Sequence, residues 1–371
     1  MKKSTPIWKF SLLLLLCSLF SACHVGRFFI YNFADSKDHQ KFPKITVEKA
    51  PNSSPFQFAR HEDATTRPFE MTINGVAYTK EQWMKKTGSI AFLIIQKDSL
   101  VFEIYNHPQG EAAIVPSFSV AKSYTSALLG IAIAEGYIDN VQQSVREFLP
   151  ELPEEPFQAI TLEHLLNMKS GLDFKESYVN PFGHVAKFYY GTNLKQFTKK
   201  LQAAHPPGKK YHYSSGDTFL LGWAIEAATQ QKLPKYLQEK IWKPLGMEYD
   251  ASWSVDSKKH QMAKAFCCIN ARAHDFAKFG RLYLNDGVWE GDSIIPREWV
   301  ERSTTFETNK GGYNYQWWHR QSDAPDTFFA QGILGQFIYV NRSKHLIMVR
   351  LGRKYGNMNW PWLFQELAQK M

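Results

Sequence analysis

The stretch "PSFSVAKSYTSALLG", from Pro116 to Gly130, places a serine three residues before a lysine at the head of an apolar segment. Residues three apart lie on one face of a helix, so the side chains of Ser119 and Lys122 are expected to touch. The apolar residues that follow predict a central, dry helix. A lysine there loses its hydration, its pKa falls, and the neutral amine can then accept the proton of the serine.

The overall composition indicates a large folded core. The 371 residues are 44% hydrophobic and 15% aromatic, which is enough for one large domain or two interleaved ones. Charged residues make up 21%, which argues against wholesale disorder. The net charge is +9, but the basic residues come as scattered pairs such as Lys199-Lys200. We therefore expect a solvated surface, no nucleic-acid partner, and at most a weak attraction to an anionic envelope.

The N-terminus predicts export. "MKKSTPIWKFSLLLLLCSLFSAC" has a basic start, an apolar stretch and small residues before Cys23, so residues 1–22 are interpreted as a signal peptide. The ending "LFSAC" resembles a bacterial lipobox, which would make Cys23 the lipidated N-terminus. The alternative is ordinary cleavage nearby, with Cys23 a bystander. We thus expect either a membrane-anchored bacterial lipoprotein or a periplasmic or otherwise extracytoplasmic protein. Residues 23–70 are expected to form the tether to the lipid anchor and a loose N-terminal wrap.

The rest of the chain, 71–371, is expected to form one α+β domain. Two β-rich runs around Lys97-Asp98 predict a hairpin over residues 89–106, and short strands recur over 326–352 before a closing helix. Between them, a helical insert is expected at about 140–315. This order favours an antiparallel β-sheet flanked by helices, assembled from both ends of the chain, with a helical second lobe.

The adjacent residues Cys267 and Cys268 are expected to be unbonded. Neighbouring cysteines rarely pair because the geometry is strained, so both are interpreted as small buried apolar residues. The cysteines predict neither a disulfide framework nor metal-ligand spacing. Dinucleotide, Walker and zinc-binding motifs are also lacking from the sequence, so no cofactor and no metal are expected.

Two further stretches add chemistry to the serine and lysine. "PPGKKYHYSSGDTFLLGW" (206–223) sets Tyr213 after a turn and before a helix, and a tyrosine beside a lysine can have a depressed pKa and share the proton transfer. "FFAQGILGQFIYVNRSKHLIMVRLG" (328–352) has glycines that allow close backbone approach along a strand. Such a strand suits an extended substrate and can donate an N–H to an oxyanion.

In this order, the three stretches resemble the serine β-lactamase and penicillin-binding protein superfamily. The closest likeness is to its class C-like branch, which includes esterases, D-amino-acid peptidases and 6-aminohexanoate dimer hydrolases. "ITLEHLLNMKSGLD" (160–173) and "IWKPLGME" (241–248) support the resemblance, which covers roughly residues 70–370. It implies a β-lactamase/transpeptidase-like fold with the site in a cleft between the sheet and the helical lobe.

The resemblance also implies roles by position. Ser119 would be the acylated nucleophile, Lys122 its base partner, and Tyr213 the tyrosine that helps to move the proton to the leaving group. Gly332 and Ile333 fall on the third-motif strand, so the amides of Ser119 and Ile333 would form the oxyanion hole.

The sequence departs from the superfamily in two motifs. Motif two usually ends in Asn, where this chain has Ser215, and the third motif is often Lys-Thr-Gly, where it has Ala330-Gln331-Gly332. A lysine there normally grips a substrate carboxylate, so one charge-assisted contact is missing. The change favours a less charged amide or ester over a β-lactam or a D-alanine terminus.

Candidate substrate-binding residues lie in and beyond these motifs. Tyr178 stands in a loop that could cover the cleft, and Trp318 follows Trp317 just before the last strands, although loop and core packing explain such aromatics about as well. The full set expected to bind substrate is Ser215, Gln331, Gly332, Tyr178 and Trp318.

Histidines could suggest a different nucleophilic site. His212, His319 and the pair His274-Asp275 are present, but none follows a G-x-S-x-G elbow, so all are expected to be structural. The literal E-x-x-L-N at Glu163 is likewise interpreted as ordinary helix.

The sequence therefore predicts an exported serine hydrolase that cleaves a small amide, ester or peptide substrate through an acyl-enzyme on Ser119. One alternative is a peptidase or esterase acting on cell-wall or D-amino-acid material. An alternative of another class is a non-catalytic envelope lipoprotein that binds peptides.

Overall fold

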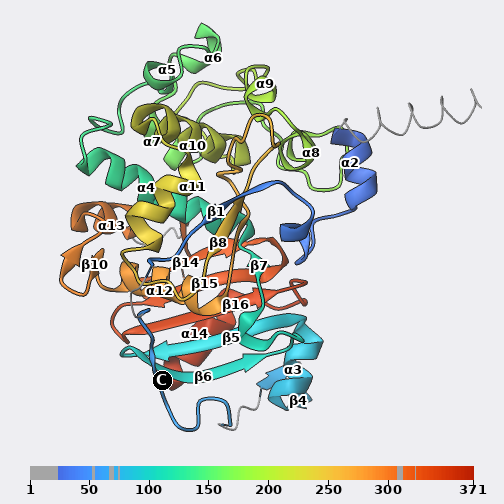
Figure 1. Ribbon diagram of the computed structural model, residues 1–371, viewed down its shortest axis with the longest axis vertical. Helices are drawn as coiled ribbons and strands as arrows, with labels where there is room; N and C mark the ends of the chain where they lie inside the picture. The colour runs from blue at the N-terminus through green and yellow to red at the C-terminus, as the bar shows by residue number, and fades with distance from the viewer. Residues whose placement is uncertain (1–23, 52–54, 67–70, 74–75, 307–311, 322) are drawn as a thin grey trace, which may run out of the picture.

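The central element of the computed structural model is an eight-stranded sheet built from both ends of the chain (Figure 1). The structure describes residues 24–51, 55–66, 71–73, 76–306, 312–321 and 323–371. Every neighbouring pair in the sheet is antiparallel except the short β2–β6 pair. The strands, in spatial order, are β12 (Gly312–Asn314), β13 (Trp317–His319), β14 (Thr327–Gly332), β15 (Gln336–Asn341), β16 (Leu346–Gly352), β5 (Ser89–Gln96), β6 (Ser99–Tyr105) and β2 (Ala59–Arg60).

The hairpin of β5 and β6 confirms the prediction for residues 89–106. Gln96 pairs with Ser99, so the turn consists of Lys97 and Asp98 alone. Both have positive φ, 50° and 59°, as the two-residue type I′ turn requires. This turn twists in the same sense as the strands and therefore fixes their register.

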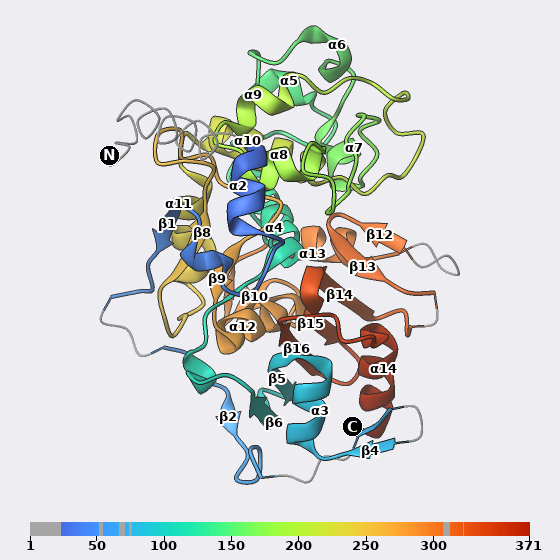
Figure 2. The ribbon, with the colours of Figure 1, turned by 90° about the vertical axis from the view of Figure 1, so that its right-hand side faces the viewer.

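Both faces of the sheet are buried, which explains why its strands are apolar along most of their length. On β5, Leu93 and Ile95 join one core while Phe92 and Ile94 join the other, as the two-residue repeat of a strand requires. The helices α4 (Ala121–Ala134) and α12 (Ala273–Leu284) belong to the first core, and α3 (Lys80–Thr87) and α14 (Trp360–Lys370) to the second (Figure 2). The predicted α+β class with helices on an antiparallel sheet is thus confirmed.

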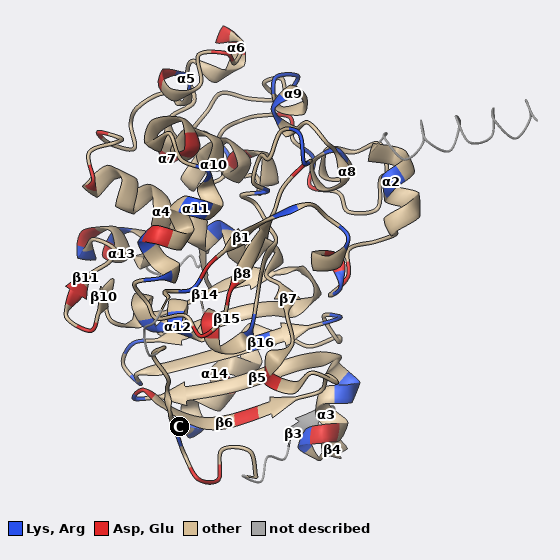
Figure 3. Ribbon diagram, in the orientation of Figure 1, with Lys and Arg blue, Asp and Glu red and all other residues tan. Residues whose placement is uncertain are grey.

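A helical lobe lies beyond one end of α4 (Figure 1). Its helices are α5 (Val145–Phe148), α6 (Glu154–Phe157), α7 (Leu162–Leu166), α8 (His184–Tyr190), α9 (Leu194–Thr198), α10 (Ser215–Thr229) and α11 (Leu233–Leu237). The side chain of Thr161 caps α7 by accepting from the amide of His164, as a helix start at this threonine requires. In Figure 3, charged residues gather on the outer helices and loops, whereas the strands of the large sheet are mainly tan.

The segment 140–315 is not helical throughout. It also supplies β8 (Ala251–Ser254) and β9 (Ile269–Ala271) to a four-stranded sheet with β1 (Lys44–Val47) and β7 (Val115–Pro116). After β9 the chain returns to the large sheet, against which α12 packs. This stretch also contains the π-helical turn η4 (Gln238–Trp242), β10 (Val288–Trp289), β11 (Asp292–Ser293) and α13 (Arg297–Thr304).

The described part of the N-terminal segment packs on the body of the protein through a helix and a strand. Helix α2 (His24–Tyr31) lies on α8, and β1 pairs with β8 over all four of its residues. Apolar and aromatic contacts hold this segment down, including the ring of Phe28, which lies 5.3 Å from that of Tyr190. Cys23 and the predicted signal peptide lie outside the described residues. Among those described, no helix combines the length and the apolar character needed to cross a membrane.

Candidate active site

The structure brings Ser119 and Lys122 together at the start of α4. Ser119 lies in a short 3-10 turn, η3 (Phe118–Val120), that leads directly into the helix. Lys122 Nζ lies 3.2 Å from Ser119 Oγ, 3.2 Å from Ser215 Oγ and 2.9 Å from the carbonyl oxygen of Phe266. The three-residue spacing therefore produces the contact that helical geometry predicts.

Burial makes Lys122 an unusual lysine. Its side chain is 1% exposed, and desolvation lowers its pKa from 10.5 to about 8. The carboxylates of Glu176 and Asp217 oppose this shift, because each favours the charged amine. The balance leaves a substantial neutral fraction near pH 8, and only the neutral amine has a lone pair that can accept a proton.

Tyr213 lies beside the lysine but does not behave as predicted. Its ring centroid is 5.0 Å from Lys122 Nζ and 5.5 Å from that of Trp318. Burial raises the pKa of Tyr213 far above its usual range, and the charge of Glu176 raises it further. The prediction of a depressed pKa is wrong, because burial of the phenol raises its pKa by more than a hydrogen bond with Ser119 lowers it. Tyr213 is therefore a neutral phenol that can donate a proton.

Glu176 is a member of the site that the sequence analysis missed. Its Oε1 accepts from Ser215 Oγ at 2.7 Å and from the Tyr178 hydroxyl at 2.8 Å, and its Oε2 accepts from the Ser215 amide at 2.9 Å. The carboxylate thus sits at the N-terminal end of α10, where the helix dipole favours negative charge. An acid in a loop carries no signal of this contact, since Glu176 and Ser215 are 39 residues apart.

The end of β14 passes directly against the turn that carries Ser119. A Cβ atom on Gly332 would lie 2.6 Å from the Ser117 carbonyl oxygen and 3.1 Å from the Ser119 amide nitrogen, so only glycine fits. Ile333 follows at the start of a second 3-10 turn, η5 (Ile333–Gly335). The structure therefore brings the two residues expected to form the oxyanion hole, Ser119 and Ile333, to one place, where both line the same cavities.

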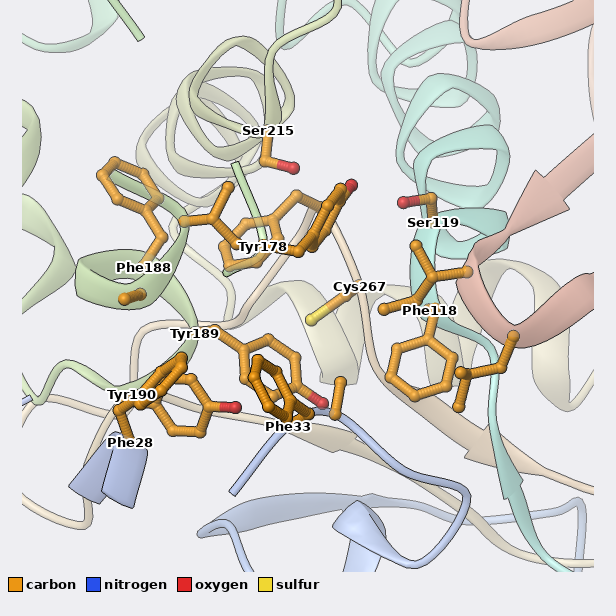
Figure 4. Close-up of a pocket in the computed structure, with 16 residues that line it drawn as sticks. Phe28, Phe33, Phe118, Ser119, Tyr178, Phe188, Tyr189, Tyr190, Ser215 and Cys267 are labelled. Carbon is orange, nitrogen blue, oxygen red and sulfur yellow. The ribbon is translucent and has the colours of Figure 1, made fainter. Parts of the chain in front are cut away.

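Two cavities meet at Ser119. The first has a volume of about 270 Å³ and includes Ser215 and Tyr178 in its lining. The second, about 260 Å³, is lined by Ser119, Tyr178, Tyr213, Trp318, Gln331, Gly332, Ile333, Leu334 and Tyr355. Figure 4 shows the hydroxyls of Ser119 and Ser215 facing one another across the first cavity. Every residue expected to bind substrate thus lies at one cavity or the other, whereas Trp317 is buried in the core.

The prediction of unbonded cysteines is wrong. Cys267 and Cys268 form a disulfide with each other, and Cys267 lines the first cavity. A tight turn, in which the Cys267 amide donates to the Lys264 carbonyl and Cys268 has a φ of 73°, brings the two sulfurs together. Both residues are buried, as predicted. The turn also presents the Phe266 carbonyl to Lys122.

The histidines lie outside the site. His212 contacts the Phe174 carbonyl, and His319 contacts that of Thr327. His274 lies 2.7 Å from Glu103, and this contact with a second one to Glu248 raises the histidine pKa to about 9. Ligand atoms of Glu103, Glu111 and His274 lie near one another, but Glu103 already accepts from Tyr105 and pairs with Arg60.

The serine-hydrolase class of site on a β-lactamase-like fold is defined by a partly buried serine beside a buried lysine, a neighbouring tyrosine and a glycine-ended strand. The chain matches the family described as Beta-lactamase over residues 77–359, which is most of its length. The protein belongs to this family, as the sequence resemblance predicted. It is a β-lactamase-family serine hydrolase.

Relatives of known sequence or structure agree with this assignment. The chain is 25% identical over 310 residues to a 6-aminohexanoate-dimer hydrolase of Paenarthrobacter ureafaciens, covering 76% of this chain and 75% of that one. A solved structure described as "Putative 6-aminohexanoate-dimer hydrolase from Bacillus anthracis" matches with a TM-score of 0.79 at 23% identity, over 90% of this chain and 92% of that one. A family VIII carboxylesterase matches with a TM-score of 0.61 at 14% identity, over 76% and 91%. The two structural matches show the shared fold.

Proposed function

We propose that the protein hydrolyses a small amide or ester through an acyl-enzyme on Ser119. One observation carries this proposal, namely the hydrogen-bond directions around Lys122. Ser215 Oγ donates its proton to Glu176, so it must accept from the lysine, and the Phe266 carbonyl can only accept. A neutral amine has two N–H groups and one lone pair. The protonated amine donates to all three oxygens, whereas in the neutral amine both N–H groups are engaged by Ser215 and Phe266 and the lone pair faces Ser119 Oγ at 3.2 Å.

The proton path follows from the two pKa shifts. Lys122 accepts the proton of Ser119 as the oxygen attacks the carbonyl, and the amides of Ser119 and Ile333 stabilise the oxyanion. Tyr213 gives its phenolic proton to the leaving nitrogen or oxygen and recovers one from the Lys122 ammonium. Water then attacks the carbonyl of the acyl-enzyme, and its proton follows the same path in reverse, through Tyr213 and Lys122 to Ser119. This step releases the acid and restores the Ser119 hydroxyl.

The substrate class rests on the altered third motif and on the relatives. Ala330 stands where the motif has the lysine that would hold a substrate carboxylate, and the side-chain amide of the next residue, Gln331, lies 3.5 Å from the Tyr355 hydroxyl. The second cavity is therefore suited to a neutral polar leaving group. The name of the Paenarthrobacter relative supports amide hydrolysis, so both amides and esters belong in the first substrate panel.

Hydrolysis of an ester and an amide panel tests the proposal. Ser119→Ala and Lys122→Met are each expected to lower kcat/KM by at least a thousandfold, because the first removes the attacking oxygen and the second removes the amine that accepts its proton. Ser126→Ala is the matched control, since Ser126 lies buried on the same helix and its hydroxyl has no hydrogen-bond partner among the described residues. Full activity in Ser119→Ala would refute the proposal.

We further propose that the protein is exported and lipid-anchored at Cys23. The support is the signal-like N-terminus and the lipobox-like ending described above. Expression with a labelled fatty acid is expected to give a labelled protein in the membrane fraction, and Cys23→Ala is expected to abolish the label. An unlabelled soluble protein with an intact Cys23 would contradict the anchor.

A further inference from the structure

The two cavities that meet at Ser119 differ in which catalytic group they contain. Tyr213 lines only the second cavity, together with Gln331 and Tyr355. A general acid must lie within hydrogen-bonding reach of the atom that it protonates. The leaving group therefore occupies the second cavity, and the acyl group occupies the first cavity. This assignment rests on the function proposed above.

The first cavity has an aromatic wall supplied by the N-terminal segment. Phe28, Phe33 and Ala34 line it, and Figure 4 shows Phe28 and Phe33 at the end of the cavity away from Ser119. The opposite walls are mainly aromatic as well, with Phe118, Phe188, Tyr189, Tyr190 and Phe266. The far end of the cavity is thus closed by residues that come just after the predicted anchor site.

The N-terminal wall is held in place by specific contacts. The Tyr190 hydroxyl donates to the Asn32 carbonyl at 2.6 Å, and Lys41 Nζ donates to the Tyr31 carbonyl at 3.0 Å. The ring of Phe28 packs on Tyr190 and on Phe33, with centroids 5.3 and 5.5 Å apart. These contacts fix residues 28–34 as part of the site, so changes in this segment should change which substrates fit.

The chemistry of the lining excludes a charged occupant. None of the described residues that line the first cavity carries a charge. Glu176 lies behind Ser215 and Tyr178 and already accepts hydrogen bonds from both. An ammonium or carboxylate placed in the cavity would lose its hydration without gaining an ionic partner.

We propose that the first cavity is the acyl subsite, that it selects uncharged apolar acyl groups of medium length, and that Phe28, Phe33 and Ala34 determine this selection. Each methylene that enters is expected to raise kcat/KM by up to about fourfold until the cavity is full. The N-terminal segment is thereby a specificity element of the enzyme and not merely a link to its anchor.

A series of p-nitrophenyl esters from acetyl to octanoyl tests the acyl assignment. For the wild-type protein, kcat/KM is expected to rise at least tenfold from acetyl to hexanoyl. Ala34→Trp fills the cavity and should lower the hexanoyl-to-acetyl ratio at least tenfold, and Phe33→Ala, a change at a 53% exposed position, should lower it about threefold. Phe29→Ala is the matched control, because Phe29 lies next to Phe28 on α2, four residues before Phe33, is 69% exposed and does not line the cavity.

A second comparison isolates charge. A hexanoyl ester is expected to be preferred at least tenfold over the 6-aminohexanoyl ester, which differs only by its terminal ammonium. Equal rates for this pair, a flat acyl series, or ratios in Ala34→Trp and Phe33→Ala that match the wild type would overturn the inference. The inference would also be overturned if Ala34→Trp changed the dependence of kcat/KM on the chain length of the alcohol and not on that of the acyl group. No turnover of any ester or amide would instead refute the proposed function itself.

Discussion

The pH dependence of acylation tests the role assigned to Lys122. With a pKa of about 8, the amine is neutral in about 1% of molecules at pH 6, about 10% at pH 7 and about 50% at pH 8. A lysine at the ordinary value of 10.5 would be neutral in only about 0.03% at pH 7. Burial thus increases the reactive fraction at neutral pH about 300-fold.

This balance predicts the shape of the profile of kcat/KM. The rate should rise about tenfold per pH unit below pH 7 and level off near pH 9, because kcat/KM reports ionisations of the free enzyme. Glu176→Gln removes a charge that raises the pKa of Lys122, so the rising limb should move to lower pH. The assay is ester hydrolysis in buffers of constant ionic strength, with thermal unfolding used to verify the fold.

Glu163→Gln is the matched control for this experiment. Glu163 is another half-buried carboxylate with several partners, among them Arg302 and Tyr315, but these lie outside the site. Its substitution should leave the limb in place. A wild-type profile that is flat between pH 6 and 9, or a limb that moves to higher pH in Glu176→Gln, would refute the reasoning.

Three further changes are expected to separate stability from activity. Lys122→Met should raise the free energy of unfolding at pH 7 by about 1–3 kcal/mol while abolishing hydrolysis, because it removes a costly buried amine. The lysine pKa is lower in the folded state, so this gain should be full below pH 8 and disappear as the pH rises toward 10.5, as pH-dependent chemical denaturation would show. Gly332→Ala should lower kcat about a hundredfold, since its Cβ would collide with the Ser117 carbonyl beside the oxyanion amides; unchanged kcat would contradict the close approach. Arg350→Met should cost about 3 kcal/mol or more in thermal unfolding, because Arg350 is fully buried and donates to the Leu334 and Gly335 carbonyls that shape the turn after Ile333; a cost below 1 kcal/mol would argue against this role.

Local patterns were sufficient to predict the parts of the fold that depend on neighbouring residues. The Lys97-Asp98 turn fixes its hairpin through the conformation of two residues. The contact between Ser119 and Lys122 follows from the geometry of one helix turn. The alternation of apolar side chains along β5 follows from the pleat of a strand.

The parts that local patterns did not predict depend on contacts between distant segments. Glu176 reaches Ser215 from a loop, and Phe33 reaches the first cavity from a segment interpreted as a tether. The bond between Cys267 and Cys268 accompanies a tight turn with a positive φ at Cys268, which the two adjacent cysteines do not reveal by themselves. The raised pKa of Tyr213 required knowledge of its burial, which its sequence position beside a turn does not give.

Intact mass spectrometry after exposure to a fluorophosphonate tests the central claim most directly. Such a probe reacts with an activated serine, and the account predicts one adduct per chain that maps to Ser119. The adduct should be absent from Ser119→Ala and present in Ser126→Ala. No adduct in a folded wild-type protein, or an adduct at a different residue, would contradict the claim that Ser119 is the nucleophile.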